Sequence, residues 1–347
     1  MVLRGILAGA ALAVVGSFGV SVTAVPANAA EIIDGPKVNW NFAVWGKRRA
    51  FTEGMEYAAE QVKERTGGKF TITMGYGSFS KPKETLDGVK LGATQGAMFC
   101  NFYHPGKNPA FMVFTLPFLP LGDPDVRIRV TRKLYEHPAL VADMDRWNAM
   151  TYVSTILPQY EFFGRGKEPH KPEDFAGMRV RAGGGIGSAM EKLGATLSTV
   201  PATEVYTTLE RGTVDAASFP YTYAHVAYKL HEIADWFTGN LSPGTSECPA
   251  VFNKDAYAAL PQQYKDLLMG MRDEIYAVQK KAYADIDAKN LPMLREKLTE
   301  ITYTEEQRAD FQEKAGKVVW DEWVKDNPKL PGQELIDLIL SEAKASM

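Results

Sequence analysis

Arg181 stands where a short predicted strand ends and a glycine-rich turn begins, and its guanidinium is well suited to bind a small anion. Met178 and Val180 alternate with Arg179 and Arg181, the period-two pattern of a strand, and glycines follow at 183–185 and 187. Ligands usually bind at the carboxyl ends of strands in open α/β sheets, and a guanidinium matches a carboxylate with two parallel hydrogen bonds. The local pattern leaves a second interpretation open, in which Arg181 pairs with a structural carboxylate.

Alternating strands and helices must position this arginine. A second helix follows it, opened by Pro201, Thr203 and an acidic first turn at Glu204 and closed by Gly212. Residues 213–219 then return to strand character. Nearer the amino terminus, the pattern predicts a strand over 38–44, a helix over 48–64 and a strand over 69–74. This order is typical of βαβ units and predicts a largely parallel sheet.

The ordered residues around Arg181 resemble the extracytoplasmic solute receptors of tripartite ATP-independent periplasmic (TRAP) transporters. No single position is specific, but the ordered set is, and the resemblance extends along nearly the whole mature chain, including residues 65–68 and 116–118. The positions that carry it are Pro172, Glu173, Asp174, Gly177, Arg181, Leu193, Gly194, Ala195, Pro201, Glu204, Val205, Tyr206, Leu209, Gly212, Val214 and Asp215.

The resemblance implies an α/β, two-lobed periplasmic binding protein fold of the type II-like kind, with a long helix spanning both lobes. We place that helix at residues 262–298, lobe I at 30–157 and 245–282, and lobe II at 158–244 and 283–347. Further helices are predicted at 224–236, 305–325 and 332–344. The resemblance also implies that Arg181 clamps a ligand carboxylate and that membrane permease subunits receive the ligand.

Residues at strand ends and in loops are the candidates for lining a cleft between the lobes. We expect about half of the aromatic candidates to be ordinary packing residues, because aromatic side chains dominate cores as well as pockets. With Arg181, the candidates are Trp45, Asn101, Tyr103, Gln159, Glu161, Phe219, Tyr223 and Glu247.

Two candidates depart from the family pattern, because many relatives have an arginine near Glu161 and an asparagine where this chain has Phe219. A buried Glu161 would need a partner, namely Arg181, Arg165 or a cationic part of the ligand. We therefore expect a monocarboxylate with an apolar, aromatic or cationic remainder rather than a dicarboxylate or sialic acid. Some relatives hold a metal near Glu247, but a single glutamate leaves metal unassigned here. No cofactor is expected, and the identity of the acid stays open.

The amino terminus predicts export. Arg4 precedes an apolar run from Ile6 to Val25, and residues 27–29 form an A-x-A site, so residues 1–29 are predicted to be a signal peptide and the mature chain to be periplasmic. An uncleaved anchor is the alternative interpretation. The chain has 39 basic and 42 acidic residues and no basic run, so nucleic acid is not an expected partner. We expect a monomer, although the sequence does not decide the oligomeric state.

Cys100 and Cys248 are the only cysteines. An exported chain could join them in one disulfide, but their separation in the sequence says nothing about their distance in space. For a fold of this size we expect buried free cysteines as the commoner outcome.

Other functional classes lack their motifs. The five histidines form no HExxH pattern, no G-x-S-x-G elbow is present, and the glycines after Arg181 do not continue into a phosphate-binding loop. We therefore predict a binding protein rather than an enzyme. The sequence leaves two alternatives open: a receptor for an ABC permease or for a signalling partner, and a periplasmic enzyme whose catalytic residues come together only in the fold.

Overall fold

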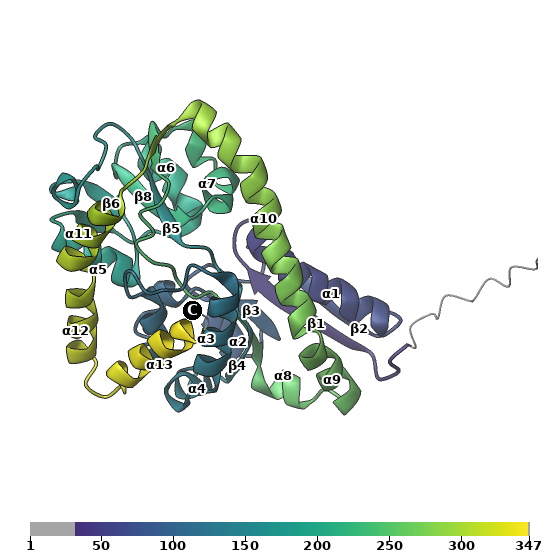
Figure 1. Ribbon diagram of the computed structural model, residues 1–347. Coiled ribbons are helices and arrows are strands. Elements are labelled where there is room, and N and C mark those ends of the chain that lie inside the picture. Colours follow the sequence, from purple (N-terminus) through teal and green to yellow (C-terminus); the bar gives the residue numbers. More distant parts are fainter. Residues whose placement is uncertain (1–31, 346–347) are drawn as a thin grey trace, which may run out of the picture. The chain divides into compact units, whose positions relative to one another are not determined.

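The computed structural model describes residues 32–345 (Figure 1). The predicted signal peptide, residues 1–29, lies outside the described residues. The described chain forms two mixed β-sheets with helices packed around them, which confirms the predicted α/β class. Within 32–345, no helix combines the length and the apolar character that a membrane span requires.

The first sheet, here called sheet A, has five strands in the order β2-β1-β3-β10-β4. Strand β1 is parallel to both β2 and β3, as the βαβ pattern predicts, whereas β10 runs antiparallel to β3 and β4. A late segment of the chain therefore inserts into the sheet formed by the first part. The strands are β1 (Val38–Val44), β2 (Phe70–Tyr76), β3 (Gly96–Met98), β4 (Ala149–Val153) and β10 (Ala250–Asn253).

The second sheet, sheet B, has six strands in the order β11-β9-β5-β8-β6-β7. Strand β8 is parallel to β6, which carries Arg181, and antiparallel to β5. Every residue of β5 and β8 is buried, so both strands lie inside the lobe. The strands are β5 (Tyr160–Gly164), β6 (Arg179–Arg181), β7 (Thr196–Ser198), β8 (Ala216–Pro220), β9 (Trp236–Thr238) and β11 (Thr299–Ile301).

Thirteen α-helices and six short 3-10 segments surround the sheets of the described chain. The α-helices are α1 (Glu53–Arg65), α2 (Thr85–Lys90), α3 (Pro124–Glu136), α4 (Pro138–Asp145), α5 (Gly184–Lys192), α6 (Val205–Glu210), α7 (Tyr223–Ala227), α8 (Lys254–Ala258), α9 (Gln262–Gly270), α10 (Arg272–Lys297), α11 (Glu305–Ala315), α12 (Lys317–Asp326) and α13 (Gly332–Lys344). The 3-10 segments are η1 (Ala50–Thr52), η2 (Asn101–Tyr103), η3 (Ala110–Thr115), η4 (Pro172–Phe175), η5 (Ala202–Glu204) and η6 (Leu230–Glu232).

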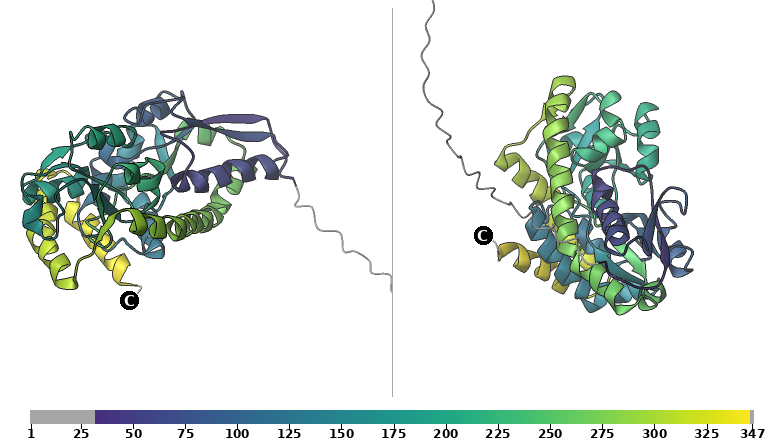
Figure 2. Two further views of the ribbon diagram at one scale, coloured as in Figure 1. Left: turned by 90° about the horizontal axis from the view of Figure 1, so that it is seen from above. Right: turned by 90° about the vertical axis from the view of Figure 1, so that its right-hand side faces the viewer.

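The long helix is present, but it begins later than predicted. Residues 262–298 form two helices, α9 and the 26-residue α10, separated at Met271. Gly270 is a poor helix former, and the acidic residues Asp273 and Glu274 favour a new helix start, which explains the break. Helix α10 packs against α1 beside sheet A, and against α7 and the edge strand β11 of sheet B. Figures 1 and 2 show how this helix runs along the protein. It therefore connects the two lobes as the resemblance implied.

Two other predicted helices are also interrupted. Residues 224–236 form α7 and η6 and then enter β9, because Lys229 adopts a left-handed conformation with φ 62° that ends the helix. Residues 305–325 divide at Gly316 into α11 and α12. Helix α13 packs against α3, beside sheet A, although the predicted boundaries assigned residues 283–347 to lobe II (Figure 1).

Cys100 and Cys248 form a disulfide, so the expectation of free cysteines is wrong. Cys100 follows β3 and Cys248 precedes β10, and these two strands pair in sheet A, which brings the cysteines together. Pairing of strands that are distant in the sequence is decided by the tertiary fold, so local pattern could not reveal it. The bond closes a long loop, since the cysteines are 148 residues apart.

We expect the Cys100→Ser/Cys248→Ser variant to be less stable than the wild type by roughly 2–5 kcal/mol, because a cross-link across a long loop restricts the unfolded chain. Urea unfolding followed by circular dichroism measures this difference. A thiol reductant should lower the midpoint of the wild type and leave that of the double variant unchanged. Equal midpoints for the wild type with and without reductant would contradict the prediction, provided that thiol titration confirms reduction.

Candidate ligand-binding site

The guanidinium of Arg181 is held by backbone carbonyls of sheet B. Nε and Nη2 donate to the Val200 carbonyl at 3.1 and 2.9 Å, and Nη1 donates to the Ser218 carbonyl at 2.9 Å. The residue is only 2% exposed. Because arginine has more N–H groups than these bonds use, one donor on each of Nη1 and Nη2 remains without a partner among residues 32–345. The side chain is thus fixed in place with its donors partly available.

No acidic side chain of the described chain forms an ion pair with Arg181. Its charge instead lies over two aromatic rings, with the guanidinium carbon 4.7 Å from the centre of Phe219 and 5.5 Å from that of Phe102. A buried cation without a counterion is costly, and aromatic faces offset little of that cost. The interpretation of Arg181 as a structural ion-pair residue is therefore not supported. An anion at this position would relieve the cost.

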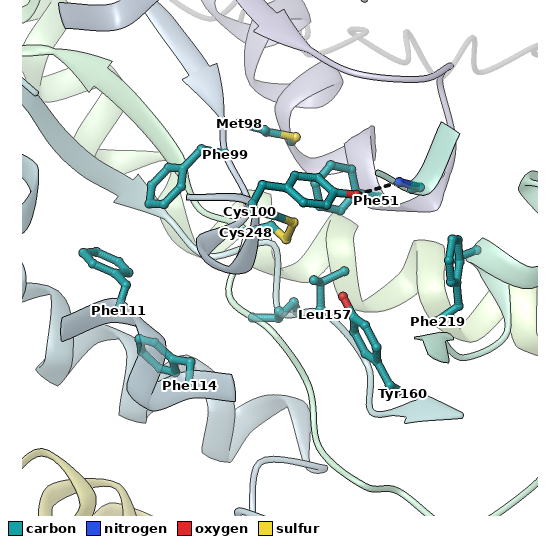
Figure 3. Packing of buried hydrophobic residues seen from close by; sticks show 14 of the residues in the cluster. Phe51, Met98, Phe99, Cys100, Phe111, Phe114, Leu157, Tyr160, Phe219 and Cys248 are labelled. Atoms are coloured by element: carbon teal, nitrogen blue, oxygen red, sulfur yellow. Dashed lines mark hydrogen bonds between the residues drawn. A yellow bond between two sulfur atoms is a disulfide. The ribbon is translucent and has the colours of Figure 1, made fainter. Parts of the chain in front are cut away.

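Arg181 lines a small cavity of about 30 Å³ between the loops of the two sheets. The described residues around it include no aspartate or glutamate. Figure 3 shows part of this region, with the disulfide close to Leu157 and with Tyr160 and Phe219 nearby. The lining residues are Trp45, Arg49, Phe51, Cys100, Phe102, Tyr103, Leu157, Tyr160, Arg181, Ala202, Phe219, Pro220, Tyr223, Ala224, Tyr228 and Cys248.

Contacts between the two lobes close this cavity. The Ala202 amide beside sheet B donates to the Tyr103 hydroxyl beside sheet A at 2.8 Å. Phe51 stacks on Tyr223, with ring centres 6.4 Å apart. Gly183 allows a third contact, because a Cβ there would lie 2.4 Å from the ring of Phe102. Because Gly183 has no side chain, the Phe102 ring can pack against the Arg181 guanidinium.

The structure brings together five of the nine predicted site residues. Trp45, Tyr103, Phe219 and Tyr223 line the cavity with Arg181. Glu161, Asn101, Gln159 and Glu247 do not line it, and each has partners elsewhere in the protein. All four lie in or beside two kinds of segment: those that cross between the lobes, and those next to the disulfide between the ends of β3 and β10. They therefore stabilise the segments that surround the cavity.

Glu161 is buried in β5 and binds the crossing segment that follows β9. Its carboxylate accepts hydrogen bonds from the Thr238 hydroxyl at 2.5 Å and from the Leu241 and Ser242 amides at 3.2 and 2.8 Å. The predicted pairing with Arg165 is not formed, because Arg165 donates instead to the Leu209 and Glu210 carbonyls. Burial raises the pKa of Glu161 to about 7, although these hydrogen bonds act in the opposite direction. Glu161 therefore fixes the segment that follows β9.

Asn101 and Gln159 have similar structural roles. The Asn101 amide nitrogen donates to the Phe111 carbonyl at 2.8 Å, and its oxygen accepts from the Phe102 amide at 2.9 Å. The Gln159 amide fits between two loops, with its nitrogen 2.8 Å from the Gly244 carbonyl and its oxygen 3.2 Å from the Gly122 amide. Their side-chain groups are thus occupied by backbone partners.

Glu247 forms a buried ion pair with Arg127 of α3, a residue that sequence reasoning missed. The Glu247 carboxylate lies 2.8 Å from Arg127 Nη2 and accepts a hydrogen bond from the Tyr135 hydroxyl at 2.6 Å. Both charged side chains are almost completely buried. The two charges of this pair compensate each other, whereas Arg181 has no acidic partner in the described chain. Among residues 32–345, no cluster of three or more histidine, cysteine, aspartate or glutamate side chains could hold a metal ion.

Several cavity residues were not predicted from the sequence. Arg49 and Tyr228 contribute polar groups, and Phe51 and Tyr160 contribute aromatic faces. Arg49 belongs to a basic triplet, residues 47–49, directly after the predicted Trp45-Gly46 pair, so its position at a strand end was a usable signal. Tyr228 follows a short helix whose end the sequence pattern placed wrongly.

Comparison with known proteins agrees with this fold. Residues 43–326 match the model of bacterial extracellular solute-binding protein family 7, and the chain belongs to this family of TRAP solute-binding proteins. A monocarboxylate 2-oxoacid-binding periplasmic protein of Nostoc is 27% identical over 244 residues, which are 67% of this chain and 64% of that protein. The match therefore spans less than two thirds of that relative's length.

Solved structures share the two-lobed fold. A marine metagenome TRAP solute-binding protein specific for aromatic acid ligands, in complex with metahydroxyphenylacetate, aligns with a TM-score of 0.79 at 19% identity, covering 89% of this chain and 99% of that one. A TRAP protein from Bordetella bronchiseptica with bound (R)- and (S)-mandelate aligns with a TM-score of 0.78 at 20% identity, covering 89% and 100%. At these identities the alignments show the fold and not the ligand.

The raised pKa of Glu161 predicts a pH-dependent effect of Glu161→Gln. The pKa of Glu161 is raised from its ordinary value of 4.5 to about 7 in the folded protein. The folded state therefore binds the proton more tightly than the unfolded state. The contribution of this group to stability is therefore largest below the lower value and falls as pH rises to 7. The wild type should exceed Glu161→Gln in unfolding free energy by more at pH 5 than at pH 8.

At pH 8 we expect the variant to lose about 1–3 kcal/mol, because its amide nitrogen would face the donors of residues 238–242. Urea titrations at pH 5, 6, 7 and 8 measure both effects. Glu313→Gln, on the exposed side of α11, serves as the matched control and should show no such trend. A gap between the wild type and Glu161→Gln that stays constant with pH would refute the assignment of the titration to Glu161.

Proposed function

We propose that this protein is the solute receptor of a TRAP transporter, that it binds a small organic acid through Arg181 in the cavity between its lobes, and that it delivers the acid to membrane permease subunits. The supporting observation is the buried Arg181, which has no acidic partner in the described chain and lines a cavity without carboxylates. We further propose that residues 1–29 direct export to the periplasm and that the receptor performs no chemical conversion of the acid.

The ligand that fits this site best is a monocarboxylate with an apolar or aromatic remainder. Aromatic rings from both lobes surround the guanidinium, and they favour a flat or apolar group next to the carboxylate. The cationic remainder suggested by Glu161 is not supported, because that carboxylate is occupied by Thr238 and the crossing segment. Related proteins that bind monocarboxylates and aromatic acids support the same class.

Ligand entry requires the lobes to separate. The cavity of about 30 Å³ has room for about one water molecule, far less than a carboxylic acid of several carbons needs. Two segments cross between the sheets, residues 154–159 and 239–249, and α10 connects the lobes on the outside. We propose that bending of these segments, near the predicted boundaries at 157/158 and 244/245, opens the cleft. Closure then surrounds the bound carboxylate with Arg181 and the aromatic rings.

Replacing Arg181 tests the site. Arg181→Lys keeps a positive charge but loses the planar pair of donors, and Arg181→Ala loses both, so we expect affinity for a carboxylate ligand to fall at least about tenfold in the first and further in the second. Isothermal titration calorimetry with benzoate, mandelate, metahydroxyphenylacetate and pyruvate provides the measurement, after a thermal-shift screen selects the acids that the wild type binds.

Arg179→Lys is the matched control. Arg179 lies in the same strand, but its side chain is exposed and pairs with Asp215, so this change should leave affinity as in the wild type. Wild-type affinity in both Arg181 variants would show that the carboxylate binds elsewhere. Chemical conversion of a bound acid, followed by NMR spectroscopy, would contradict the non-catalytic role.

A further inference from the structure

Arg49 and Tyr228 lie between the small cavity at Arg181 and a larger outer pocket. Both line the cavity that contains Arg181, and both also line an outer pocket of about 620 Å³. Arg49 follows β1 of sheet A, whereas Tyr228 follows α7 beside sheet B, and the guanidinium carbon is 5.6 Å from the centre of the tyrosine ring. These two side chains, one from each lobe, therefore form the mouth of the cavity.

The hydrogen-bonding capacity of Arg49 is only partly used. Its Nη1 donates to the Trp45 and Lys47 carbonyls at 2.9 and 2.6 Å. Its Nε is buried and has no hydrogen-bond partner among residues 32–345, and no acidic side chain of that range forms an ion pair with it. The charge rests on the ring of Phe51, 4.6 Å from the guanidinium carbon. The arginine is thus fixed by backbone carbonyls and aromatic packing, as Arg181 is.

Tyr228 places a second unsatisfied group at the same point. Its hydroxyl is buried and has no partner in the described chain. Gly46, with φ +76°, lets the two side chains approach, because a Cβ there would lie 2.9 Å from the tyrosine hydroxyl and 3.2 Å from Arg49 Nη1. The Tyr228 ring also packs edge-on against Phe219, which lies under Arg181. The two arginines are therefore linked through one pair of aromatic rings.

Arg49 Nε and the Tyr228 hydroxyl are thus two buried polar groups, one from each lobe, that have no partner in the described chain. Leaving such groups unsatisfied when the lobes close is unfavourable. Each of them can donate a hydrogen bond to an oxygen acceptor of a bound acid. Arg181 and Arg49 belong to opposite lobes. When the carboxylate of a ligand binds Arg181, a different part of that ligand lies at the mouth formed by Arg49 and Tyr228.

We propose, on the basis of the function proposed above, that Arg49 and Tyr228 form a second binding position that holds an oxygen acceptor of the acid other than the carboxylate at Arg181. The ligand class is then a hydroxy or oxo acid with an apolar or aromatic body. An acid without the second oxygen leaves both groups unpaired when the lobes close, so it binds less tightly than its oxygenated counterpart.

Matched pairs of ligands test this position: benzoate against 3- and 4-hydroxybenzoate, and phenylacetate against mandelate. For the wild type, calorimetry should show at least one oxygenated acid binding about tenfold more tightly than its parent. In Arg49→Met and in Tyr228→Phe this preference should fall to about twofold or less, because each change removes a donor while retaining most of the apolar contact. Circular dichroism melting identifies any variant that fails to fold, and the other variant then carries the test.

Arg48→Met is the control, since Arg48 lines only the outer pocket, is exposed and pairs with Glu53. It should keep the wild-type preference. An unchanged preference in both Arg49→Met and Tyr228→Phe would overturn the second position, and so would a wild type that binds every parent acid as tightly as its oxygenated form. If the wild type binds none of these acids, or if Arg181→Ala binds them normally, the proposed function itself is wrong.

Discussion

The uncompensated charge of Arg181 is the constraint around which the site is organised. Its guanidinium is 2% exposed, held by two backbone carbonyls and covered by Phe102 and Phe219, yet the described chain supplies no carboxylate to neutralise it. Arg127 shows the alternative, because it is equally buried but paired with Glu247. The charge of Arg127 is therefore compensated within the protein, and the charge of Arg181 is not compensated by any carboxylate of the described chain.

Buried polar groups of the frame keep the crossing segments in place around this charge. Glu161 binds the segment after β9, the Arg127–Glu247 pair joins α3 to the residues before β10, and the disulfide ties that region to the end of β3. Each interaction connects parts of the chain that are far apart in the sequence. Together they hold the segments between the two sheets in fixed positions around the cavity.

Sequence reasoning succeeded where local pattern is strong and failed where long-range pairing decides the outcome. The alternation at Val38–Val44 predicted β1 correctly, and the alternation before the glycines predicted the short strand that ends at Arg181. Glu161 and Glu247 were expected in the cleft because both are polar residues in loops or at strand ends, but neighbouring strands and α3 supply their partners instead. The break at Met271 was overlooked because both flanking segments are helical.

The sequence by itself determined the family, the α/β class with its long helix, and the arginine that distinguishes the site. These features depend on the order and spacing of residues, which are local properties of the chain. Only the tertiary structure decided which polar side chains are already paired, that Cys100 and Cys248 are bonded, and that Arg49 and Tyr228 meet at the mouth of the cavity. Those outcomes depend on distances between remote segments, which sheet pairing and lobe packing set.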